Sequence, residues 1–167
     1  MLRIIGSVMV LTTCAWAGFS AADRLRRRRD FLTSFITSLT VMQTEIVFGR
    51  RALAEIFRGL DREGRLYGFY GSCAGAVAEK GIRRAWNEAV DRAAARAALT
   101  AGDIDVLRSV GAELGMSDID GQTRTIKRAS ELLSANAAEA GESYARLAKM
   151  YRGCGVLSGI FAVLMLM

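Results

Sequence analysis

The sequence predicts an all-α protein, an antiparallel helical bundle of about six helices flanked by N- and C-terminal membrane helices. Apolar residues recur at helical spacing through the middle of the chain, and no stretch shows the period-two alternation of strands. Both ends are uncharged runs of membrane-like composition. We expect a transmembrane anchor at 1–23, a basic stop-transfer segment at 24–30, a cytosolic bundle at 31–152 and a short hydrophobic helix, predicted to lie in the membrane, at 153–167.

The N-terminal run from Ile4 to Ala22 carries no charge. As a helix it would be about 28 Å long, close to the roughly 30 Å of a bilayer core. Trp16 and Phe19 lie toward its C-terminal end, where aromatic side chains favour the membrane interface. A cleaved signal peptide is the alternative, but a cluster of arginines directly after the run is typical of a stop-transfer signal.

That cluster orients the chain. It consists of Arg24, Arg26, Arg27, Arg28 and Arg29. The positive-inside rule places them, and the residues that follow, in the cytoplasm. Beyond them the charge is nearly balanced, with 16 basic and 15 acidic side chains in 31–150. Nucleic acid is therefore not an expected partner, because binding it needs basic residues spread along a face. Attraction for anionic lipid headgroups is expected as a secondary effect.

The C-terminal run, from Gly153 to Met167, is also uncharged. Its helix would reach only about 22 Å, which is short for a full span. Gly155 and Gly159 form a GxxxG pair that permits close helix approach in lipid. A hydrophobic helix buried in the bundle is the alternative. The predicted topology is a hairpin that puts both termini across the membrane from the central domain.

Between these ends, glycines punctuate the predicted helices because the chain contains no proline. The segments expected to be helical are 30–49, 52–64, 66–81, 83–99, 100–115 and 117–152. The first ends at Gly49 and the fifth at Gly115, each in the position after a helix where glycine is favoured. Thr100 and Asp103 form a capping box at the start of the fifth. The sixth is expected to be able to continue into the C-terminal run.

The chain offers little for catalysis. It has no histidine, and its three cysteines, Cys14, Cys73 and Cys154, are too far apart for a zinc motif. We expect reduced, buried thiols. No nucleotide-binding or hydrolase motif is present. The sequence therefore predicts no enzyme activity, no cofactor and no metal. Glu45 stands near a helix C-terminus, which the helix dipole disfavours, and this weakly suggests contact with a partner.

Four blocks, taken in their order and spacing, resemble the stage III sporulation protein AB family of endospore-forming bacteria. They are "LTVMQTEIVFGRRALAEIF", "AWNEAV", "LTAGDIDVLRSVGAELGMSDIDGQTRTI" and "AKMYRGCGVLSGIFAVLML", and they follow an N-terminal span that ends in "RLRRRR". The resemblance runs nearly the whole chain. It implies a cytosolic helical domain similar to those of the type II secretion platform protein.

The resemblance further implies a non-catalytic platform in the channel complex that links mother cell and forespore. Its partners would be the secretion-type ATPase stage III sporulation protein AA, other sporulation channel membrane proteins and the lipid bilayer. It would lie in the mother-cell membrane at the forespore septum. The motif positions to test for partner contact or bundle integrity are Glu45, Gly49, Asp103, Asp118 and Gln122. The alternative is a membrane-tethered helical adaptor, unrelated to secretion, that binds another cytosolic partner.

Overall fold

A computed structural model describes the backbone of residues 2–49, 52–61, 66, 68–114 and 119–166, and the side chains within these from residue 20 to residue 150. The described residues form α-helices and one π-helical turn, with no strand among them. The elements are α1 (Leu2–Thr44), η1 (Glu45–Gly49), α2 (Leu53–Asp61), α3 (Phe69–Lys80), α4 (Ile82–Ala97), α5 (Ala101–Glu113) and α6 (Ile119–Leu166).

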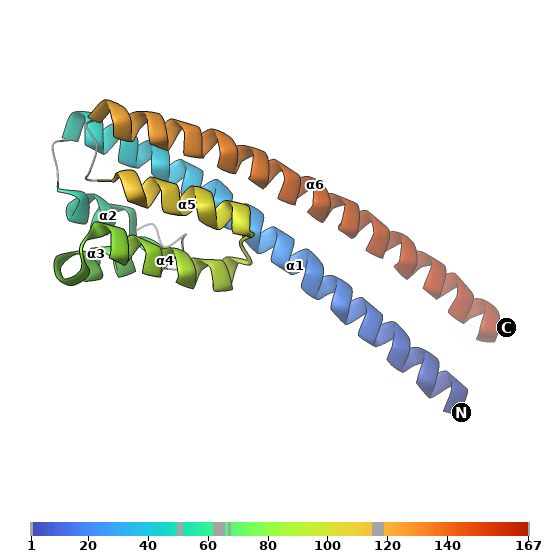
Figure 1. The fold of residues 1–167 in the computed structure, drawn as a ribbon. Coiled ribbons are helices and arrows are strands. Elements are labelled where there is room, and N and C mark those ends of the chain that lie inside the picture. The colour runs from blue at the N-terminus through green and yellow to red at the C-terminus, as the bar shows by residue number, and fades with distance from the viewer. Residues whose placement is uncertain (1, 50–51, 62–65, 67, 115–118, 167) are drawn as a thin grey trace.

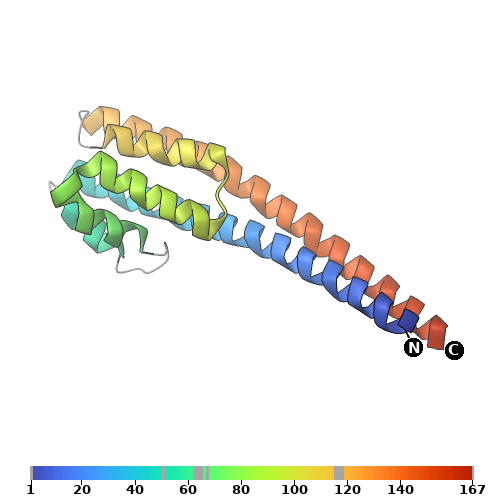
Figure 2. The ribbon, with the colours of Figure 1, turned by 60° about the horizontal axis from the view of Figure 1, so that its bottom comes forward.

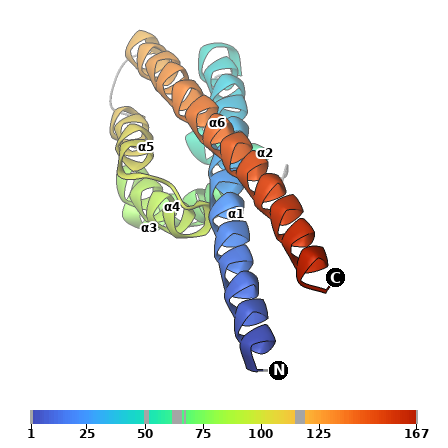
Figure 3. The same ribbon diagram turned by 90° about the vertical axis from the view of Figure 1, so that its right-hand side faces the viewer.

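Two long helices form the frame of the molecule. α1 and α6 pack side by side in antiparallel fashion, and both continue past the bundle as a two-helix stalk (Figure 1). The N- and C-terminal ends lie at the same end of the molecule, as a second view also shows (Figure 2). α5 packs on α6, α4 on α5 and α3 on α4, so the short helices cover one side of the frame near its other end (Figure 3).

The core of the bundle is aromatic. The ring of Phe69 lies 5.0 Å from that of Trp86 and 5.4 Å from that of Phe35, both edge to face. Tyr70 stacks on Phe35 at 6.1 Å, and its hydroxyl lies 2.6 Å from Ser38 Oγ, where either oxygen can be the donor. Edge-to-face and offset rings add stability beyond burial alone. Because these rings come from α1, α3 and α4, they fix the short helices onto the frame.

Helix ends follow local chemistry. Thr100 Oγ1 accepts from Asp103 N, and the Asp103 carboxylate accepts from Thr100 N, so the predicted capping box is confirmed. Gly81 joins α3 to α4 with φ of 75°, which a side chain would strain. Gly111 is required for a different reason: a Cβ there would collide with the indole of Trp86.

The two long helices join segments that the sequence analysis named separately. The anchor, the arginine cluster and the first bundle helix are not separate segments, because α1 is one helix from Leu2 to Thr44. Its α-helical part then changes to the π-helical turn η1 before ending at Gly49, the predicted end. α6 runs unbroken from Ile119 to Leu166, as the sequence allowed, with Gly155 and Gly159 inside it.

Candidate functional site

The end of η1 and the start of α6 lie at the end of the frame opposite the stalk (Figure 1). Large apolar side chains are exposed there. We call Val41, Val47, Phe48 and Ile119 the distal tip. Phe48 is 81% exposed and Ile119 is 53% exposed, whereas every phenylalanine of the bundle core is buried. An exposed aromatic among aliphatic side chains is a common feature of a protein-binding surface.

Phe48 lies in the π-helical turn η1, which follows a series of threonines on α1. Four threonine hydroxyls on the solvent face of α1 donate to carbonyls four residues earlier, from Thr33, Thr37, Thr40 and Thr44. Such back-bonding weakens and bends helices. After Thr44 the helix widens into η1, and widened turns of this kind occur frequently at functional sites. The core stripe of α1 ends at Met42, and Phe48 lies beyond it.

The residues predicted to contact a partner divide into two groups. Glu45 and Gln122 are half-buried near the distal tip, on η1 and the first turn of α6. Gly49 is the last residue of η1. Asp118 and Gly115 lie outside the described residues. Asp103 is elsewhere, fully buried at the start of α5.

Asp103 joins three helices. Its carboxylate accepts two hydrogen bonds from the Arg28 guanidinium, at 2.7 and 3.1 Å, and one from Asn136 Nδ2 at 2.8 Å. Burial alone would raise the pKa of Asp103, but the hydrogen bonds from Arg28 and Thr100 outweigh it and leave the pKa below its ordinary value. The carboxylate therefore stays charged inside the protein. Asp103 was to be tested for partner contact or for bundle integrity, and this geometry favours bundle integrity.

Arg28 departs from the prediction for its cluster. Its side chain is 9% exposed, and it connects α1 to α5 through Asp103. Its neighbours Arg26 and Arg27 are 62% and 45% exposed and pair with Asp30 and Asp23 on the same helix. The cluster is therefore not uniform. Arg28 is a core residue of the bundle, and the exposed arginines remain available for the orienting role.

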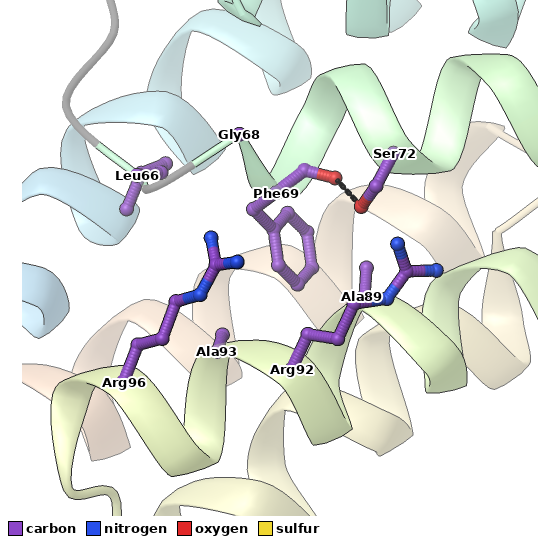
Figure 4. A pocket seen from close by; sticks show the side chains of 8 residues that line it. All are labelled: Leu66, Gly68, Phe69, Ser72, Ala89, Arg92, Ala93 and Arg96. Carbon is purple, nitrogen blue, oxygen red and sulfur yellow. Dashed lines mark hydrogen bonds between the residues drawn. The ribbon is translucent and has the colours of Figure 1, made fainter.

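The described residues provide few features that could support catalysis or ligand binding. Burial raises the pKa of the Cys73 thiol to about 12, so Cys73 is protonated and unreactive, in agreement with the expected buried thiol. No group of three or more potential metal ligands occurs among the described side chains. A cavity of about 60 Å³ beside Phe69, with Arg92 and Arg96 at its rim (Figure 4), is far smaller than the several hundred Å³ of ordinary ligand sites.

The sequence did not predict the exposure of Phe48, the buried pairing of Arg28 or the contact of Asn136 with Asp103. Helical spacing could have found Arg28, because it lies one turn before Leu32 and two before Phe35 on the buried face of α1. Asn136 follows Leu133 by three residues in the same way. The exposure of Phe48 had no such signal, since a phenylalanine beside apolar residues is normally assigned to the core.

Membrane spanning has partial support. By length and composition alone, Ser20–Gly49, which covers part of α1 and all of η1, could cross a membrane, and 33% of its most apolar window is buried in the bundle. That segment is a core helix as well as a candidate span. The side chains of the anchor predicted at 1–23 lie largely outside the described ones, so the anchor stays a prediction.

Comparison with known proteins gives consistent results. The family model described as stage III sporulation protein AB matches residues 3–167. A curated relative, stage III sporulation protein AB of Bacillus subtilis (strain 168), is 25% identical over 171 residues and is covered completely, as is this chain. A solved structure of a stage III sporulation protein AB superposes with a TM-score of 0.64 at 18% identity, covering 71% of this chain and 97% of that one. This last likeness supports the all-α fold.

Proposed function

The chain belongs to the stage III sporulation protein AB family, and from that premise we propose that it is a non-catalytic membrane platform in the channel complex between mother cell and forespore. It is a sporulation protein. In this proposal the apolar ends of α1 and α6 hold the bundle at the membrane, and the bundle docks the secretion-type ATPase stage III sporulation protein AA. Nucleotide hydrolysis would take place in that ATPase.

The arrangement of the two long helices supports anchoring. Both uncharged runs lie at one end of the frame, so both could enter one bilayer from the same side (Figure 2). α6 alone spans about 72 Å, taking 1.5 Å per residue over its 48 residues. The part of α6 before its uncharged run, the 34 residues from Ile119 to Arg152, spans about 51 Å and would hold the distal tip well away from the bilayer surface, where a cytosolic partner could reach it.

The exposed side chain of Phe48 carries the docking proposal. It belongs to the block "TEIVFG", one of those on which the family resemblance rests. Burying an aromatic ring of this kind against a partner is a typical source of interface energy. Glu45 and Gln122, half-buried nearby, would add polar contacts around it.

The experiment compares Phe48→Ala with Leu132→Ala, both in full-length protein reconstituted in vesicles. Leu132 is a matched control because it is also exposed and apolar, at 46%, but lies farther along α6. We expect vesicles with the wild type or Leu132→Ala to capture the purified ATPase, and Phe48→Ala to weaken capture at least about tenfold, as for an interface hot spot.

Equal capture of the ATPase by all three proteins would contradict the distal tip as its binding surface. No capture by folded wild type would contradict the ATPase as partner. Capture of a different cytosolic protein through Phe48 would favour the adaptor alternative.

A further inference from the structure

The antiparallel pairing of the stalk brings basic side chains from distant parts of the sequence to one level. Arg29 lies over the ring of Tyr144, with its guanidinium carbon 6.0 Å from the centroid. This contact shows which residues of the two helices lie at the same level. At 1.5 Å per residue, Arg24 on α1 and Lys149 on α6 each lie about 7.5 Å farther toward the chain termini.

We propose that this basic collar binds the anionic headgroups of the membrane leaflet next to the bundle. The collar consists of Arg24, Arg26, Arg27, Arg146 and Lys149, all exposed. By the same rise per residue, Arg146 lies about 3 Å and Arg26 about 4.5 Å from the Arg29–Tyr144 contact, both toward the chain termini. The collar is thus a band across both helices, and its α6 half is not evident from the N-terminal arginine cluster.

Part of this charge is left uncompensated by the protein. Arg27 pairs with Asp23 at 2.9 Å and Arg26 with Asp30 at 3.6 Å. Among the described residues, no acidic side chain forms an ion pair with Arg24, Arg146 or Lys149, although Glu142 lies nearby in sequence. These three exposed cations can therefore pair with counterions from outside the chain.

The position of the collar indicates the source of those counterions. Beyond it on α1 the uncharged run begins at Ala22, and beyond it on α6 only Arg152 precedes the uncharged run from Gly153. A bilayer that receives these runs would put its headgroups at the level of the collar. Basic residues at such a surface contribute about 1 kcal/mol each, or roughly fivefold in lipid association. Lipid is favoured over nucleic acid because the basic residues form a band around two apolar helices rather than a track along a face.

This inference rests on the proposed membrane anchoring, so the experiment distinguishes a failure of the anchoring from a failure of the collar. Full-length protein is reconstituted in vesicles of phosphatidylcholine with a minority of phosphatidylglycerol. Spin-labelled versions of the two lipids then report which one associates with the protein. The variant Arg146→Gln/Lys149→Gln removes the α6 half of the collar and leaves the orienting arginines of α1 intact. The control is Arg124→Gln/Lys127→Gln, which removes two exposed cations near the distal tip.

We expect the wild type and the control to select phosphatidylglycerol, and added salt to reduce that selectivity. The α6 variant should lose selectivity by at least about fivefold, the contribution of one basic residue or more. Equal selectivity in the α6 variant and the wild type, or equal loss in the control, overturns the collar. If alkaline carbonate removes the wild-type protein from the vesicles, both the membrane anchoring and the collar are contradicted. If the protein stays in the vesicles but shows no selectivity for phosphatidylglycerol, only the collar is contradicted.

Discussion

At the residue scale, the buried pair of Arg28 and Asp103 shows how one side chain of a repetitive cluster acquires a separate role. A buried ion pair is stabilising only if its remaining hydrogen bonds are also satisfied. Asp103 meets this requirement through Thr100 and Asn136, so three helices converge on one carboxylate. We infer that the pair fixes the register of α1 and α6 where the stalk meets the bundle, in addition to stabilising the fold.

Replacing Arg28 with methionine should destabilise the bundle strongly. The substitution keeps the apolar part of the side chain but leaves Asp103 buried without its cation, which costs about 3–5 kcal/mol. Urea unfolding of the full-length protein in detergent, followed by circular dichroism, measures the change. Arg27→Gln is the control, because its pair with Asp23 is exposed and contributes less than about 1 kcal/mol. Equal losses for the two variants would contradict a special role for Arg28.

The same site predicts a dependence of stability on pH. The pKa of Asp103 is lower in the folded protein than its ordinary value of 3.8, so the unfolded chain binds protons more readily. Its contribution is therefore complete above about pH 5 and is lost progressively as pH falls past 3.8 and through the lower folded pKa. Asp103→Asn should be less stable at neutral pH and should show a flatter decline in acid. Parallel acid profiles for the two proteins would exclude Asp103 as the group responsible.

At the element scale, α5 packs on α4 at a position where only glycine fits. Trp86 of α4 is fully buried, and its Nε1 donates to Leu107 O of α5 at 2.7 Å. This bond holds the indole where a side chain on Gly111 would otherwise lie. The close approach of the two helices therefore depends on the glycine.

Gly111→Ala should lower stability by about 1–3 kcal/mol or more, the usual range for overpacking a core. Gly102→Ala in the same helix is the matched control, because its added Cβ would meet nothing within 4 Å. The control should leave stability unchanged or raise it by less than about 1 kcal/mol. Thermal unfolding of both variants and the wild type measures the changes in midpoint temperature. Equal midpoints for the two variants would contradict the requirement for glycine at position 111.

Helical periodicity predicted the individual helices and their buried faces better than it predicted the contacts between distant residues. The stripe of Phe31, Phe35, Leu39 and Met42 is buried as expected, because a regular repeat reveals which face of a helix is apolar. The capping box was also predictable, since its hydrogen bonds are local. The partners of Arg28 and the exposure of Phe48 depend on residues far along the chain, so composition and spacing could not supply them.

At the scale of the whole molecule, the frame of α1 and α6 connects three features. The uncharged runs lie at the end that holds both termini (Figure 1). Along α1 and α6 the basic collar and the Arg28–Asp103 pair come next, and the distal tip follows where α1 and η1 end and α6 begins. In the proposed platform, a partner at the tip would act on the same two helices that enter the membrane. Each of these helices is continuous over its described length.

The central claim is that both apolar ends enter the membrane and leave the bundle in the cytoplasm. A reporter whose activity differs on the two sides of the membrane, fused after Met167, tests this most directly. A second fusion of the same reporter within 62–65, between α2 and α3, serves as the internal control. We expect a translocated reporter at Met167 and a cytoplasmic one between the helices. A cytoplasmic reporter at both positions would contradict the two-anchor arrangement.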